Sequence, residues 1–271
     1  MRNSKAIGHV WALDTATMNV DCSMLQVGTG GKDVVIPLPS ILIEHEQGLL
    51  MYDFGLASDA AGDPAAVYGD MAAYFGMNFP SENRLDRQLE TLGFKTTDVK
   101  RVVLSHGHFD HTGGLDLFPG AQGFVGEAEL RYARTPALFD EPFFRQEDVD
   151  AAANIDWNEV PAGYDHDVFG DGSVVILSLQ GHTLGHLGLK VRLPERTIIF
   201  TGDAAHRHAN IDMTVGMPYD VLSHRKFDSL RRLKLLRTQP ETTVWVNHDP
   251  DDWARHRPRG REIYSADSYS Y

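Results

Sequence analysis

Four side chains that commonly bind metal ions lie within six residues of one another, at His106, His108, Asp110 and His111. They follow directly on an apolar, β-branched run at residues 101–104, which predicts a buried strand. Residues two apart in an extended chain point to the same side, so His106 and His108 converge. The loop then turns and brings Asp110 and His111 to the same place.

The number of donors in this loop indicates how many ions it serves. Four nitrogen and oxygen donors from so short a loop exceed what one tetrahedral ion can use, so two ions sharing the segment are the simpler interpretation. The alternative is a solvated polar loop, which the placement at a strand end disfavours.

Three further candidate ligands, His182, Asp203 and His248, each follow a predicted strand. One histidine or aspartate at a strand exit is ordinary, but together the three supply the ligands that the first loop lacks. Strand ends that converge on one edge of a layered sheet are a usual place for a site. The three strands are predicted at residues 173–179, 197–200 and 243–246.

The elements around these strands indicate the fold class. Apolar runs at residues 41–45 and 49–53 flank a Gln47-Gly48 turn and predict a hairpin. Helical patterns lie between the strands, which favours an α/β (α+β) layered architecture over a uniform βαβ winding. The remaining predictions are a strand at 187–193, and helices at 82–92 (Ser81 as N-cap, Gly93 as stop), 126–134 and 221–237. The last of these carries Leu222, Phe227, Leu230, Leu233 and Leu236 on one face.

The composition excludes several classes of protein. The chain has 271 residues, with 25 Lys+Arg against 38 Asp+Glu and a net charge of −13. Nucleic-acid binders normally carry a basic excess, so no nucleic-acid partner is expected. The single cysteine, Cys22, excludes a disulfide scaffold and a multi-cysteine zinc cluster. The 13 histidines, in contrast, supply the commonest metal ligand.

Length and hydrophobicity predict how the chain is organised. At this size one domain over residues 1–271 is expected. The longest apolar runs are too short to span a bilayer, and the N-terminus lacks a signal-peptide pattern, so we expect a cytoplasmic protein without a membrane partner. Residues 255–271 are polar and are expected to form a C-terminal surface segment or loose tail.

The order and type of these candidate ligands resemble those of the metallo-β-lactamase-fold hydrolase superfamily. The resemblance covers residues 35 to 257 and implies an αββα sandwich with the site at one edge of two sheets. Within the superfamily the chain is most similar to the N-acyl-homoserine lactone lactonases, which are quorum-quenching enzymes. The narrower similarity rests on residues 34–39, 94–99, His182-Thr183-x-Gly185-His186 and 248–253.

The resemblance implies a role for each candidate ligand at a centre of two divalent ions. It assigns His106, His108 and His182 to one ion, Asp110, His111 and His248 to the other, and Asp203 as a bridge between them. Asp53 would orient a ligand histidine or, alternatively, cap the exit of the hairpin. The nitrogen-rich ligands favour Zn²⁺, with Mn, Fe or Co as alternatives.

The implied reaction is the opening of a lactone ring. Two adjacent ions lower the pKa of a shared water, and the resulting hydroxide attacks the ring carbonyl. Asp110 is the candidate for carrying a proton to the leaving alkoxide. The resembling lactonases place a tyrosine three residues after the bridging aspartate, where this chain has His206. An imidazole N–H there is expected to donate to the substrate, the alternative being a surface histidine.

Two apolar segments are candidate walls of a substrate pocket. They are residues 67–80, with Met71, Tyr74 and Phe75, and residues 137–144, with Phe139 and Phe144. Core packing is the alternative for both, and for the first so is a contact in a homodimer.

The function expected is a dinuclear-metal lactonase acting on N-acyl homoserine lactones. A lactonase for another small lactone, of the γ-butyrolactone or pyridoxolactone type, is an alternative. A glyoxalase-II-like thioesterase is more distant, and would use a basic glutathione-binding patch late in the chain. Its candidate residues are Arg255, Arg257, Arg259 and Arg261.

Overall fold

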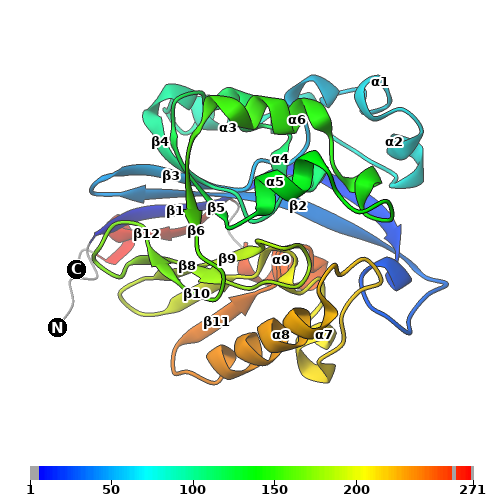
Figure 1. Cartoon of the computed structure of the whole chain (residues 1–271). Coiled ribbons are helices and arrows are strands. Elements are labelled where there is room, and N and C mark those ends of the chain that lie inside the picture. The colour runs from blue at the N-terminus through cyan, green and yellow to red at the C-terminus, as the bar shows by residue number, and fades with distance from the viewer. Residues whose placement is uncertain (1–5, 258–260, 270–271) are drawn as a thin grey trace.

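The computed structural model describes residues 6–257 and 261–269 and shows two β-sheets packed face to face between helices (Figure 1). The larger sheet has the strand order β12-β1-β2-β3-β4-β5-β6, and the smaller has the order β11-β10-β9-β8-β7. Helices α3, α5 and α6 cover the outer face of the first sheet, and α7 and α8 cover the second. The predicted αββα sandwich is therefore confirmed.

The strands of the larger sheet are β1 (Ile7–Asp21), β2 (Asp33–His45), β3 (Gly48–Tyr52), β4 (Val99–Val103), β5 (Gln122–Gly126), β6 (Asp156–Val160) and β12 (Glu262–Ser265). Those of the smaller sheet are β7 (His166–Asp167), β8 (Val174–Ser178), β9 (Leu187–Arg192), β10 (Thr197–Phe200) and β11 (Thr242–Trp245). The helices are α1 (Ala65–Tyr68), α2 (Asp70–Tyr74), α3 (Leu85–Thr91), α4 (Phe109–Thr112), α5 (Glu129–Arg134), α6 (Gln146–Ala151), α7 (His208–Met213), α8 (Ser223–Arg237) and α9 (Pro250–His256).

Side chains that alternate between the two faces of a strand pack into different layers of the fold. In β2, Ile41 and Ile43 pack into the cluster between the two sheets, which also holds Leu189 of β9. Leu42, one residue out of phase, packs against Leu89 of α3 on the other face of the sheet. Because successive side chains of a strand point to opposite faces, the apolar run Ile41–Leu42–Ile43 of β2 supplies two cores at once.

The predicted strands and helices are present with slightly shifted boundaries. Some predictions about single residues, however, are wrong. Helix α8 begins at Ser223 and buries Leu230 and Leu233, but Phe227 is 41% exposed, so its placement on the buried face was wrong. Ser81 lies in a 3₁₀ turn and does not cap α3, which begins at Leu85. Strand β1, the longest in the described chain, was missed because threonine, aspartate and asparagine interrupt its apolar residues.

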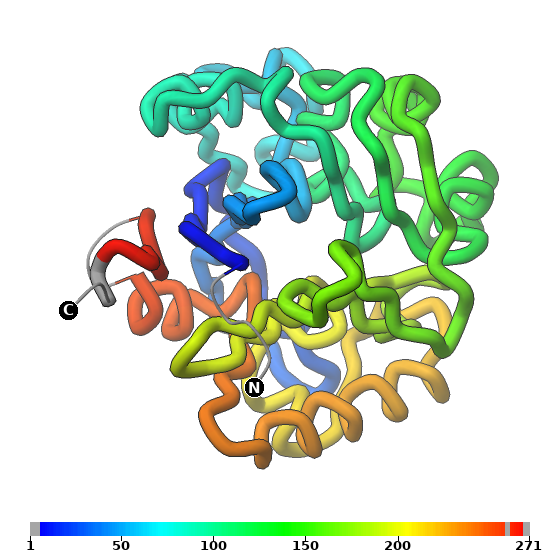
Figure 2. Tube along the Cα trace, turned by 90° about the vertical axis from the view of Figure 1, so that its left-hand side faces the viewer, coloured from blue at the N-terminus to red at the C-terminus, as the bar shows by residue number. Residues whose placement is uncertain are grey.

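The C-terminal segment is more ordered than its composition suggests. Strand β12 pairs antiparallel with β1, with Tyr264 opposite Val10, and the Tyr264 side chain is buried. Figure 2 shows this segment, in red, beside the blue N-terminal strand. The alternative of a loose tail is therefore wrong for residues 262–265, while 258–260 and 270–271 lie outside the described residues.

One close approach ties the two sheets together, and it predicts the effect of a substitution. A Cβ at Gly126, the last residue of β5, would lie 1.7 Å from the main-chain oxygen of Gly185. We expect Gly126→Ala to lower the free energy of unfolding by about 1–3 kcal/mol, measured by urea denaturation, because the backbones must separate. In the control Gly8→Ala, the new Cβ meets no atom closer than 3.6 Å. An equal loss in both variants would contradict the prediction.

Candidate metal centre and active site

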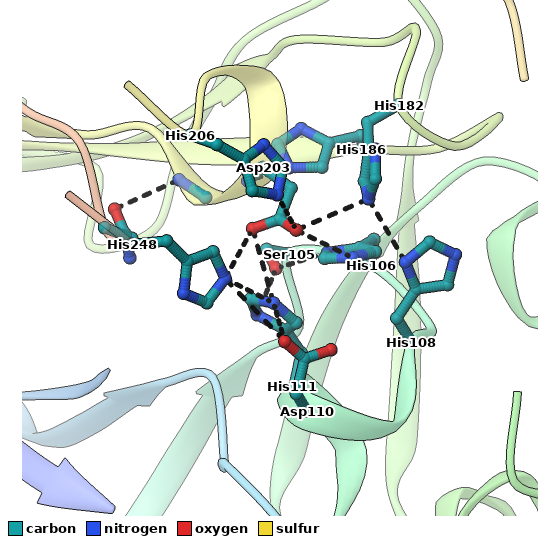
Figure 3. A network of polar contacts seen from close by, with 12 residues as sticks. Ser105, His106, His108, Asp110, His111, His182, His186, Asp203, His206 and His248 are labelled. Atoms are coloured by element: carbon teal, nitrogen blue, oxygen red, sulfur yellow. Dashed lines mark hydrogen bonds and ion pairs between the residues drawn. The ribbon is translucent and has the colours of Figure 1, made fainter. Parts of the chain in front are cut away.

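The predicted ligands come from one edge of each sheet. Strands β10 and β11 are parallel, and β8 runs in the same direction because both β8 and β10 are antiparallel to β9. The chain therefore leaves these three strands at the same edge, next to the loop that follows β4. That arrangement brings seven predicted ligands together (Figure 3): His106, His108, Asp110, His111, His182, Asp203 and His248.

The histidines form two sets of donors. In the first set His108 Nδ1 lies 3.1 Å from His182 Nε2, and His106 completes the group. In the second set His111 Nε2 lies 3.3 Å from His248 Nε2, and Asp110 completes the group. Within each set the candidate ligand atoms all lie within 4.8 Å of one another, close enough to share one ion.

Asp203 lies between the two sets and presents one oxygen to each. Its Oδ2 is 3.4 Å from His182 Nε2 and 3.8 Å from His106 Nε2. Its Oδ1 is 3.3 Å from His111 Nε2 and 3.0 Å from His248 Nε2. A carboxylate in this position can bind two ions at once, one through each oxygen.

Two of the buried donor histidines, His106 and His182, are in the neutral state that metal binding requires. Among the described residues, His106 Nε2 is fully buried and has no hydrogen-bond partner, which is costly unless a ligand occupies the space it faces. Burial lowers the pKa of His106 well below its usual value, and lowers that of His182 to about 3, so both are neutral, as metal binding requires. Burial also acts on His111, but the carboxylates of Asp110, Asp203 and Asp53 outweigh it and raise its pKa.

The outer nitrogen of each candidate ligand histidine faces a protein group, and four of the five contacts are hydrogen bonds; His108 Nε2 only lies close to the Asp140 carboxylate. Metal-binding histidines almost always donate their second N–H in this way, which fixes the ring and leaves the inner nitrogen free. The five contacts are His106 Nδ1 with Ser105 Oγ (3.0 Å), His108 Nε2 with Asp140 Oδ1 (3.3 Å), His111 Nδ1 with Asp53 Oδ2 (2.9 Å), His182 Nδ1 with Asp220 Oδ1 (3.3 Å) and His248 Nδ1 with the Pro37 carbonyl (2.7 Å).

Of these partners, Asp53 was predicted from the sequence and Asp140 was not. Asp53 was singled out at the hairpin exit; its other oxygen accepts the Ser105 N–H at 2.8 Å, so it also fixes the start of the metal loop. Asp140 was missed, although it is fully buried and accepts a hydrogen bond from the Tyr132 hydroxyl. The sequence signal for Asp140 was weak, because an aspartate in a Phe- and Pro-rich loop is ordinary.

His206 lies inside the centre. It is 5% exposed, its Nε2 lies 2.9 Å from Asp203 Oδ2, and its ring stacks on that of His248. The surface alternative for His206 is therefore wrong. Its Nδ1 is buried without a hydrogen-bond partner in the described part of the chain, as is Nε2 of His108. The short contact of His206 Nε2 with Asp203 places this side chain next to the bridging carboxylate.

An apolar cavity opens on the donors, and it corrects the predicted wall. Phe75 lines it, but Met71, Tyr74, Phe139 and Phe144 are not among its described lining residues. Tyr74 and Phe139 are 68% and 54% exposed, and Phe144 instead packs edge-on against the His108 ring. The apolar wall is Met18, Val20, Met24, Leu25, Ile36, Phe75, Phe109, Phe143, Met217 and Tyr219.

The cavity is narrow, about 60 Å³, against about 300–1,000 Å³ for typical ligand pockets. Three wall residues are methionines, whose unbranched side chains adapt easily to a ligand. A larger cavity of about 630 Å³ lies between residues 22–32, helices α7 and α9 and the end of α8, but its lining contains none of the seven metal donors. The narrow cavity is therefore the one next to the chemistry.

Comparison with known proteins agrees with the class that this fold and donor set define. Residues 35–248 match the Metallo-beta-lactamase superfamily. The chain belongs to that superfamily. N-acyl homoserine lactonase AttM of Rhizobium radiobacter is 32% identical over 263 residues, which cover 94% of this chain and 98% of that protein. AttM of Agrobacterium fabrum matches with the same identity and coverage.

A solved structure shows the same fold. It is an N-acyl homoserine lactone hydrolase with the product N-hexanoyl-L-homoserine bound at its catalytic metal centre. Its TM-score is 0.79 at 21% sequence identity, over 93% of this chain and 97% of that chain. The family resemblance inferred from the sequence is confirmed by these comparisons.

The Asp53–His111 contact generates a prediction about metal binding. We expect Asp53→Asn to weaken metal binding by about 10- to 100-fold, because an amide orients the His111 ring less strongly than a carboxylate. Competition with a chromogenic chelator measures the affinity. Asp63→Asn, the same change at an exposed position, serves as the control. Wild-type affinity in Asp53→Asn would show that the carboxylate does not orient a ligand.

Proposed function

We propose that this protein is a metal-dependent hydrolase that opens the lactone ring of N-acyl homoserine lactones and thereby quenches quorum sensing. The observation that carries the proposal is the position of Asp203, with one oxygen toward each histidine set, beside an apolar cavity. The AttM relatives, which are named N-acyl homoserine lactonases and match almost the whole chain, support the choice of substrate.

The proposed centre holds two divalent ions, with Zn²⁺ favoured and Mn, Fe or Co as alternatives. His106, His108 and His182 would hold one ion, Asp110, His111 and His248 the other, and Asp203 would bridge them. When bound, such a pair of ions makes a water nucleophilic near neutral pH and polarises an ester carbonyl.

The protein's own groups would orient the substrate and carry the proton. Asp110 lines the cavity, with Oδ2 3.6 Å from His111 Nε2 and 3.8 Å from His248 Nε2. From there its carboxyl group can carry a proton to the alkoxide that leaves when the ring opens. His206 lines the same cavity and would contact the substrate, and the apolar wall would exclude water from the acyl chain.

The thioesterase alternative loses support from the arrangement of the late arginines. Arg257 binds the Asp14 carboxylate through two hydrogen bonds of 2.7 Å, and Arg255 binds Asp252 at 2.8 Å. Arginines paired in this way do not form a free basic patch for glutathione, and Arg259 lies outside the described residues. A different small lactone remains the alternative substrate.

Several expectations remain proposals. They are a single domain over residues 1–271, a homodimer, a cytoplasmic location and the lack of a nucleic-acid partner. Within the described residues, no helix has the length and apolar character needed to cross a membrane.

A pH-stat assay of the metal-loaded protein tests the function. The panel contains N-acyl homoserine lactones of several chain lengths, γ-butyrolactone and S-lactoylglutathione. We expect acid release from the acyl homoserine lactones and none from the thioester. Failure to hydrolyse any lactone would refute the proposal, and hydrolysis of γ-butyrolactone alone would favour the alternative substrate.

The position of His206 predicts the result of two exchanges. We expect His206→Phe to lower kcat/KM for the lactone by about 10²-fold, because it removes a polar group next to the reacting carbonyl. His206→Tyr, which restores a hydroxyl donor, should recover most of the loss. The control is His224→Phe on the exposed face of α8, which should leave kcat/KM unchanged. Unchanged kinetics in His206→Phe would mean that the residue does not contact the substrate.

A further inference from the structure

One buried charge near the metal donors lies outside the ligand set and the cavity wall. Lys226, in the first turn of α8, is 1% exposed. Its Nζ donates to the main-chain oxygen of Asp203 and to Asp220 Oδ1, both at 2.8 Å. A buried ammonium is costly unless it is paired and hydrogen-bonded, and both conditions hold here.

Asp220 continues this contact to a second metal donor. The Oδ1 atom that accepts from Lys226 also lies 3.3 Å from His182 Nδ1, and Oδ2 accepts the Met217 N–H at 2.7 Å. The Asp220 carboxylate, held by Lys226 and by the Met217 N–H, can therefore orient the His182 ring with Nε2 toward the centre.

The backbone around Lys226 is fitted to the same loop. The N–H groups of Val221 and Leu222 donate to the carbonyls of His182 and Gly181. A Cβ at Gly181 would lie 2.3 Å from the backbone of Lys226, so the loop and the start of α8 touch without space between them. The start of α8 is therefore held against the His182 loop by its main chain, and Lys226 adds the link to the Asp203 loop.

We propose that Lys226 is a positioning residue of the metal centre, which fixes His182 and Asp203 relative to each other through Asp220 and the Asp203 carbonyl. These two ligands come from different loops, after β8 and β10, and their nearest donor atoms are 3.4 Å apart. The Lys226 ammonium contacts the Asp203 loop directly and the His182 loop through Asp220. The inference rests on the metal-dependent function proposed above.

The test compares the metal affinity of variants with and without Lys226. Lys226→Met is expected to weaken one of the two bound Zn²⁺ ions by about 10- to 100-fold in chelator competition, the usual effect of losing a group that orients ligands. The other ion, held by the set that contains His248, should change by a smaller factor. The visible spectrum of the Co²⁺-substituted variant should also change, because the geometry around the ion changes.

The matched control lies on the same helix. Lys234 Nζ also donates to a main-chain oxygen, that of Asp212, at 2.9 Å, but the residue is exposed and remote from the donors. Lys234→Met should leave both affinities and the Co²⁺ spectrum unchanged. If Lys226 only stabilised the fold, Lys226→Met would lower the free energy of unfolding without altering the metal affinity of the folded protein, and that result would overturn the proposal.

A second pair of variants keeps the test decisive if Lys226→Met does not fold. Removing Lys226 alone leaves the Asp220 charge buried without its cation, which is strongly destabilising. The double variant Asp220→Asn/Lys226→Met removes both charges, and its comparison with Asp220→Asn isolates the lysine. We expect the double variant to bind Zn²⁺ more weakly than Asp220→Asn, and equal affinities would overturn the proposal.

Lactone hydrolysis measured on the same samples separates the two proposals. If the wild type binds two ions but opens no lactone, the proposed function fails while the role of Lys226 in metal binding is still decided by the affinities. If the wild type opens lactones and the folded variants bind metal as tightly as it does, only the inference about Lys226 fails.

Discussion

The structure depends on the burial of one carboxylate, that of Asp203, between two sets of imidazoles. Burial alone would raise the pKa of this group, but the surrounding histidines hold it well below its usual value. Burying such a cluster is costly wherever a polar atom lacks a partner, because unpaired groups lose their hydration without compensation. The ligand histidines around Asp203 are buried as well, so their polar atoms also need partners from the surrounding residues.

Most of the surrounding structure serves that requirement. The outer histidine nitrogens contact residues from five separate parts of the chain, including Pro37 of β2 and Asp140 of the loop after α5. Glu129, fully buried at the start of α5, accepts the N–H of Gly107 at 2.8 Å and that of Gly185 at 2.7 Å. One carboxylate thus joins the metal loop of the first sheet to the His182 loop of the second. The two sheets are held together by polar contacts at the site as well as by their apolar core.

The polar centre and the apolar cavity beside it would together select the substrate of the proposed reaction. Charged and polar donors occupy the floor, while methionine, phenylalanine and aliphatic side chains form the walls. Much of one wall comes from the β1–β2 pair, in which Met18 lies directly opposite Ile36. An acyl lactone offers a polar ring and an apolar chain in the same order, which is the arrangement that such a cavity would bind.

The sequence alone determined the donor types, their spacing and the strand ends that carry them, because short-range geometry controls these features. His106 and His108 converge through the period of an extended chain, and the αββα fold followed from the family resemblance. Tertiary structure decided the rest. The cavity wall depends on the pairing of β1 with β2, and the partners Asp140, Asp220 and Lys226 are distant in sequence from the histidines they support. No local pattern marks such residues, since only packing brings their charges together.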